Sequence, residues 1–175
     1  GKRLLASILV LLMLVGTLPM QAFAAVNEDF AVNLTVEEDG TFEGRSVYTV
    51  SFQVKTTGDA QIAQQQTVVL TFDATTFDLL NQTMNDRILT LSNSELEFKK
   101  AAVDLTLGAG WQADQTMARL SEDSETGYLV WSNYLTVDPD SGIEALKTDG
   151  KFVTIATVKL VLKEGKEFAA NSFGL

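Results

Sequence analysis

The chain has 175 residues, with 13 lysines and arginines against 23 aspartates and glutamates, which gives a net charge of −10. Cysteine and histidine are absent, and this excludes disulfides, thiol nucleophiles, Ser-His triads and Cys/His metal sites. An acidic chain without a basic run lacks the clustered cations that bind nucleic-acid phosphates, while 46% hydrophobic residues are enough to form a folded core.

The first segment has the pattern of a signal peptide. Lys2 and Arg3 precede an apolar run from Leu4 to Val15, and Ala22-Phe23-Ala24 has the small-x-small pattern that signal peptidase reads. The apolar run is shorter than the roughly 20 residues that a transmembrane helix needs. We therefore expect residues 1–24 to be removed on export. The mature protein, residues 25–175, would be extracellular or on the cell surface, with no membrane span.

The mature chain is predicted to be all β. Strict alternation of apolar and polar residues predicts half-buried strands at Phe30–Val36, Tyr48–Val54 and Val103–Leu107. Thr67–Phe72 and Phe152–Leu162 are apolar on both faces, which is typical of central strands or of strands covered on both sides. Tyr128–Tyr134 is a shorter candidate strand.

Turn-forming residues separate these runs. Glu38-Asp39-Gly40 is expected to end the first strand, and Thr57-Gly58-Asp59 the second. Helical periodicity is scarce, and only Gln112–Leu120 and Ser141–Lys147 are expected to form a turn or two of helix. Many short strands with regular turns predict one sandwich or barrel domain over residues 25–175. Its abrupt end at Leu175 suggests truncation at the C-terminus.

Three stretches combine strands and turns in a specific order. Ser46–Val54 is an early strand after a Gly-bearing acidic turn, and Thr67–Leu79 is a strand that leads through Phe72-Asp73 into a second strand. Thr148–Leu160 is an Asp-Gly turn that runs into a long late strand. Together they resemble the cohesin-like family of bacterial β-sandwich modules, and the signal peptide is similar to those of Gram-positive anaerobes that carry such modules.

This resemblance implies an all-β, two-sheet sandwich with jelly-roll topology, about nine strands and little helix. It also implies a non-catalytic binding role, with a dockerin-type protein domain or a polysaccharide as partner. A structural surface-layer or adhesin domain is a third reading, and the fold alone does not choose among them. The segment of residues 81–126 is longer than in a plain cohesin, which suggests an insertion and leaves the binding face open.

Aromatic residues are the first candidates for a ligand site. Trp111 follows the flexible Gly108-Ala109-Gly110, and Tyr128 and Tyr134 flank a short strand, so these three rings are the candidate ligand contacts. Trp131, within the apolar Leu129-Val130-Trp131, is expected in the core, because large aromatic residues are usually buried.

Acidic residues give a second candidate site. Asp138 and Asp140 lie close together in a turn, where alternate carboxylates can supply oxygen ligands to calcium. The spacing lacks the terminal Glu of a full calcium loop, so an ordinary turn is the simpler interpretation, and no other cofactor is expected. Because the chain has 23 acidic residues, two carboxylates close together do not indicate a glycoside hydrolase. The sequence also has no Gly-rich loop of the kind that binds phosphate. We expect no enzymatic activity.

Overall fold

The computed structural model describes residues 29–61, 65–81, 87–93, 97–98, 104–105, 111–135 and 147–175. Within these ranges the chain forms strands and one 3-10 turn, Ala170–Ser172, and no α-helix. The strands are β1 (Phe30–Phe42), β2 (Arg45–Thr56), β3 (Gln65–Asp73), β4 (Phe77–Asn81), β5 (Arg87–Leu89), β6 (Glu97–Phe98), β7 (Asp104–Leu105), β8 (Trp111–Leu120), β9 (Thr126–Leu135), β10 (Val153–Leu162) and β11 (Phe173–Gly174).

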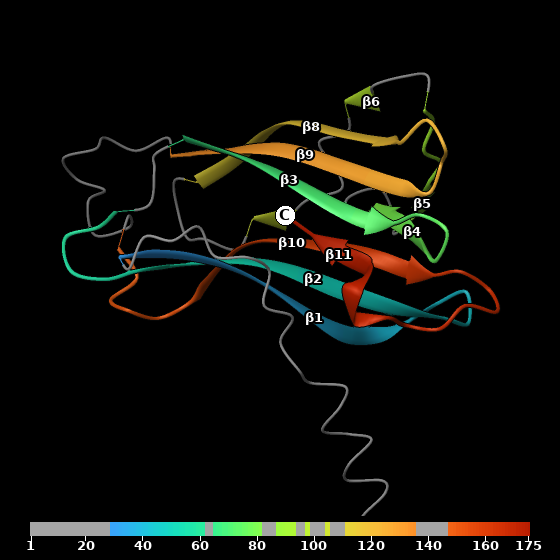
Figure 1. The fold of residues 1–175 in the computed structure, drawn as a ribbon, viewed down its shortest axis with the longest axis horizontal. Helices are drawn as coiled ribbons and strands as arrows, with labels where there is room; N and C mark the ends of the chain where they lie inside the picture. The colour runs from blue at the N-terminus through green and yellow to red at the C-terminus, as the bar shows by residue number, and fades with distance from the viewer. Residues whose placement is uncertain are drawn as a thin grey trace, which may run out of the picture.

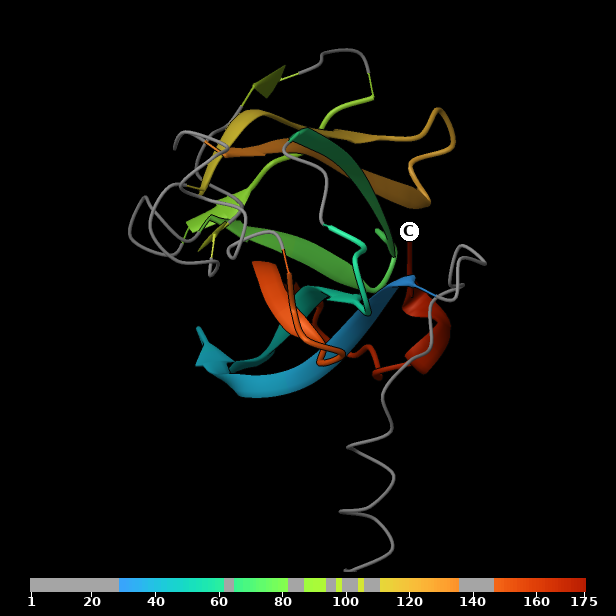
Figure 2. The ribbon, with the colours of Figure 1, turned by 90° about the vertical axis from the view of Figure 1, so that its left-hand side faces the viewer.

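The strands form two antiparallel sheets that lie face to face (Figures 1 and 2). One sheet has the order β1-β2-β10-β4-β5, with β7 also paired to β10, and the other has the order β11-β3-β9-β8-β6. The prediction of an all-β, two-sheet sandwich with little helix is confirmed. The jelly-roll winding and the domain limits at residues 25 and 175 stay predictions.

The core lies between the two sheets and follows from the alternation in the sequence. Val50, Phe52 and Val54 of β2 point into it from one sheet, and Leu129 and Trp131 of β9 from the other. The ring of Phe52 meets the indole of Trp131 edge-on, with 6.2 Å between centroids. The expectation that Trp131 belongs to the core is therefore confirmed, because its side chain is 1% exposed.

The first strand is longer than predicted. β1 continues through Glu38-Asp39-Gly40 to Phe42, so the prediction that this triplet ends the strand is wrong. A register shift between Glu38 and Thr41 forms a bulge there, and Gly40 adopts a φ of 76° that glycine tolerates best. The hairpin turn follows at Glu43-Gly44, where both φ values are positive, as in the tight turns that suit twisted strands.

The predicted helical segment Gln112–Leu120 is also wrong, because these residues lie in β8. This strand pairs with β9 along its length, and the register shifts between Asp114 and Met117. The bulge interrupts the period of two, which explains why alternation was not visible in the sequence. Most of the other predicted helical segment, Ser141–Lys147, lies outside the described residues.

The two strands predicted to be central differ. β10 lies between β2 and β4 and is confirmed as a central strand. β3 also has a neighbour on each side, but its Val69 side chain is 43% exposed, so β3 is not covered on both faces. Of the predicted strand Val103–Leu107, the structure describes only β7, and Tyr128–Tyr134 lies within β9.

Residues 1–28, with the predicted signal peptide, lie outside the described part of the chain. Among the residues that the structure describes, no helix is long and apolar enough to cross a membrane.

A hydrogen-bonded turn connects the two sheets between β3 and β4. Asp73 Oδ1 accepts hydrogen bonds from the Thr75 amide at 2.8 Å and from its hydroxyl at 2.7 Å, and Asp73 Oδ2 accepts one from the Thr76 hydroxyl at 2.6 Å. Burial raises the pKa of Asp73, but the hydrogen bonds from Thr76 and Thr75 together outweigh it and hold the pKa below its ordinary value. The ionised carboxylate therefore stabilises the turn.

This turn predicts a stability loss in acid. A carboxyl group whose pKa is depressed by folding stabilises the protein above its unfolded pKa, and this contribution is lost as the pH falls through the folded value. Below about pH 4 we expect the free energy of unfolding to fall, and to fall less steeply in Asp73→Asn, which has no charge to lose. Urea unfolding of both proteins at pH 7, 5, 4 and 3 measures this, and parallel curves would contradict it.

Candidate recognition face on the β3–β9–β8 sheet

The outer face of the β3–β9–β8 sheet carries a row of apolar side chains at its centre. The strand registers place Val69 of β3 opposite Val130 of β9, and Val130 opposite Met117 of β8. These residues alternate with Val68, Leu70 and Leu129, which point into the core, so they lie on the opposite face. Val130 and Met117 are half-buried by their neighbours, and Val69 is exposed.

Polar and aromatic side chains border this apolar row on both sides. On one side Thr71, Tyr128 and Arg119 form the next row, and the Arg119 guanidinium carbon lies 5.4 Å from the Tyr128 ring centroid. On the other side the hydroxyls of Thr67 and Ser132 lie 3.3 Å apart. An apolar centre with a polar rim is the usual arrangement of a protein–protein interface.

The outer face of the other sheet is different over β1, β2 and β10, where polar side chains bind one another across the strands. Asn33 donates to Gln53 at 3.2 Å, and Gln53 in turn donates to Thr154 at 3.2 Å. Nearer the other end, Thr49 donates to Asp39 at 2.9 Å, and Lys159 forms an ion pair with the same carboxylate at 3.4 Å. Toward β4 and β5, the same side of the sheet carries a second apolar cluster, in which Val47, Leu80 and Val161 are buried. The two outer faces therefore differ in where their apolar side chains lie.

Two of the candidate ligand residues lie on the apolar face, at different ends of β9. Tyr128 and Tyr134 both project from β9 on its outer side, roughly 20 Å apart along the strand. The Tyr134 hydroxyl donates to Gln112 Oε1 at 2.9 Å. Trp111 is the first residue of β8 and pairs with Leu135, and the structure does not describe its side chain.

The predicted calcium ligands Asp138 and Asp140 lie outside the described residues, so calcium binding there stays a prediction. Among the residues that are described, no group of three or more acidic side chains is placed to hold a metal ion.

Sequence reasoning missed the apolar centre of the face. Val69, Val130 and Met117 each look like ordinary strand residues, and only the pairing of three strands brings them into one row. The available signal is that Thr67–Phe72 is apolar on both faces, which from the sequence alone is typical of a central strand or of a strand covered on both sides.

Comparisons with family models, with curated proteins and with solved structures found no match to this chain.

Proposed function

We propose that this protein is a non-catalytic extracellular binding module of the cohesin-like type, which holds a dockerin-type domain in a cell-surface or secreted assembly. The observation that supports this most is the difference between the two outer sheet faces. One is hydrogen-bonded and polar over β1, β2 and β10, and its apolar cluster around Val161 is buried. The other has the row Val69, Val130 and Met117 between polar rims. Recognition of a partner through a sheet face requires neither a conformational change nor a catalytic step.

The proposal of a jelly-roll winding has separate support. The chain passes from one sheet to the other between β2 and β3 and returns between β3 and β4. It then changes sheet between β5 and β6, β6 and β7, β7 and β8, β9 and β10, and β10 and β11. Such repeated crossing is typical of double-sheet jelly rolls. The extracellular location rests on the signal-peptide pattern of residues 1–24.

The alternative partner is a polysaccharide, and the positions of Tyr128 and Tyr134 favour it, because both rings lie on the same face. Sugar-binding platforms need free ring faces. The Arg119 guanidinium covers one face of Tyr128, and the Tyr134 hydroxyl is held by Gln112. These contacts make the face better suited to a protein surface than to a pyranose ring.

The charge of the chain indicates the sign of the partner surface. The turn between β8 and β9 places Glu122, Asp123 and Glu125 beside one end of the face, and all three are exposed. A partner with a basic patch would be attracted to this rim, and its association rate would fall as the salt concentration rises.

The experiment that tests the proposal measures binding of the protein to a panel of purified dockerin-type domains and to soluble xylan and cellulose oligosaccharides. We expect one dockerin-type domain to bind, and Val130→Asp to weaken it by at least about tenfold, because a charge then lies unpaired at the centre of the interface. Ser51→Asp is the matched control on the polar face and should leave binding unchanged.

Two results would count against the proposal. Binding of oligosaccharides alone, lost in Tyr128→Ala and Tyr134→Ala, would assign the face to carbohydrate. Equal effects of Val130→Asp and Ser51→Asp on a bound dockerin-type domain would show that this face is not the interface.

A further inference from the structure

The sandwich is open along one side, where β1 of one sheet and β3 of the other border the gap between the sheets. β1 is the last strand of its sheet, so no described strand pairs with its outer edge. β3 pairs on its outer side with β11 at Thr71 and Phe72. The outer edge of β1, which pairs with no described strand, therefore borders this opening.

The outer edge of β1 presents a regular ladder of hydrogen-bonding groups. The Thr57 amide donates to the Asp29 carbonyl, so Asp29 and Thr57 form a hydrogen-bonded pair, and the pairs alternate from there along the hairpin. It follows that the N–H and C=O groups of Phe30, Val32, Leu34 and Val36 point away from β2, toward the open side. The same four residues direct their side chains to the core side of the sheet.

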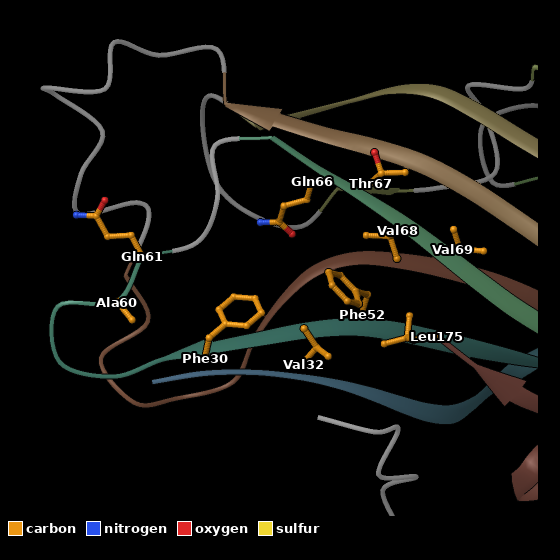
Figure 3. A pocket seen from close by; sticks show the side chains of 10 residues that line it. All are labelled: Phe30, Val32, Phe52, Ala60, Gln61, Gln66, Thr67, Val68, Val69 and Leu175. Atoms are coloured by element: carbon orange, nitrogen blue, oxygen red, sulfur yellow. The ribbon is translucent and has the colours of Figure 1, made fainter. Parts of the chain in front are cut away.

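An apolar groove of about 770 Å³ lies beside this edge. Phe30, Val32 and Phe52 line it from the β1–β2 side, and Val68 lines it from β3 (Figure 3). Leu175, which is 45% exposed, lies between the two sheets at one end of the groove. A strand placed along β1 would therefore have a backbone ladder to pair with and, beside Phe30 and Val32, a groove for its apolar side chains.

Edge strands are usually protected against such pairing by charges, proline, or a bulge. In β1 these devices occupy only the second half, with Glu37, Glu38 and the bulge after Glu38. The stretch Phe30–Val36 has no charged residue and no proline. It is bounded by acids on both sides, since Asp29 precedes it and Glu37 and Glu38 follow, all exposed.

From this charge pattern we propose that the β1 edge and its groove bind an extended segment of a partner protein, which joins the sheet as an added strand. The segment would carry apolar residues at alternate positions, to fill the groove, and lysine or arginine at both ends, to meet Asp29 and Glu37–Glu38. This site is separate from the β3–β9–β8 face and does not rest on the function proposed for it.

A second copy of the chain fits the edge less well. The antiparallel self-pairing that matches all four outward residues is centred on Asn33, and it places Asp29 of each copy opposite Glu37 of the other. Like charges directly opposite each other destabilise a strand pair.

The test uses a synthetic acetylated and amidated peptide with seven alternating valines and threonines between two lysines at each end. A matched control peptide has glutamates in place of the lysines. We expect the lysine peptide to slow amide hydrogen exchange at Phe30, Val32, Leu34 and Val36 by at least about tenfold. At low salt it should bind at least about tenfold more tightly than the glutamate peptide. Val32→Pro, which removes an outward N–H and no bond to β2, should weaken binding by about tenfold.

A second variant tests the proposal without the risk that Val32→Pro fails to fold. Glu37→Lys with Glu38→Lys changes only exposed side chains and should reverse the preference between the two peptides. Val130→Asp, on the other sheet, should leave peptide binding unchanged, which separates this proposal from the function proposed above. Protection at other amides, no protection at all, or equal binding of the two peptides would overturn the proposal. Sedimentation that showed a dimer protecting the same four amides would assign the edge to a second copy and would also overturn it.

Discussion

Replacing Gly127 with alanine is expected to lower the free energy of unfolding by roughly 3 kcal/mol, because the added methyl group would enter a filled part of the core. Gly127 of β9 pairs with Phe72 of β3, and both residues are buried. A β-carbon at Gly127 would lie 2.5 Å from both Cε atoms of the Phe72 ring and closer still to Cζ. The ring has little room to move, since Phe72 is 2% exposed, so the backbone of β3 or β9 has to shift.

Two further variants separate this clash from the ordinary cost of losing a glycine. Gly40→Ala meets no atom within 4 Å, so it should show only the cost of an alanine at positive φ, about 1 kcal/mol. Phe72→Leu removes the ring atoms that clash. The double variant Phe72→Leu with Gly127→Ala should therefore lose less stability than the sum of the two single variants. Urea unfolding of the wild type and the four variants measures these losses. Strict additivity of Phe72→Leu and Gly127→Ala would show that the ring is not what excludes the methyl group.

The elements that the sequence predicted well are those in which local pattern and tertiary environment agree. Val50, Phe52 and Val54 alternate with polar residues in the sequence, and in the structure the same residues alternate between core and solvent. The Asp149-Gly150 turn was visible because its two positive φ angles of 51° and 76° need residue types that are rare in strands.

The errors occurred where a bulge or a distant partner determines the structure. In β8 the bulge between Asp114 and Met117 breaks the alternation, and the pairing with β9 overrides the weak helical propensity of the segment. In β1 glycine at position 40 was interpreted as the end of a strand, although it accommodates a bulge inside the strand. A glycine with positive φ serves either purpose, and the sequence does not distinguish them.

The candidate sites depend on strand order, which is set by long-range pairing. The apolar row Val69–Val130–Met117 exists only because β3, β9 and β8 are neighbours, and the open edge of β1 exists only because β1 is last in its sheet. Strand order involves residues far apart in the chain, such as Val50 and Val158, which pair across β2 and β10. Single residue patterns such as Tyr128 and Tyr134 could be identified from the sequence, but the surface around them could not.

Replacing Thr148 with valine is expected to lower the free energy of unfolding by about 2 kcal/mol, because it leaves a buried backbone donor without an acceptor. Thr148 and Thr56 bind each other at the end of β2. The Thr56 amide donates to Thr148 Oγ1 at 2.7 Å, and the Thr148 amide donates to Thr56 Oγ1 at 2.9 Å. The Thr148 hydroxyl also donates to the Thr56 carbonyl at 3.3 Å.

Valine has nearly the shape of threonine, so the loss in Thr148→Val would report the missing hydroxyl rather than a cavity. Thr148→Ser is the matched control. It keeps the hydroxyl and loses one methyl group, and should cost less, about 1 kcal/mol. Hydrogen exchange at the Thr56 amide gives a local measurement, and it should be faster in Thr148→Val than in Thr148→Ser. Equal stability of the two variants, with equal exchange at Thr56, would show that the reciprocal threonine bonds do not hold the Asp149-Gly150 turn against β2. Faster exchange at Thr56 in Thr148→Val alone would show that the reciprocal threonine bonds hold the turn against β2. The same turn is also bound to β2 by a hydrogen bond from the Gly150 amide to the Thr56 carbonyl.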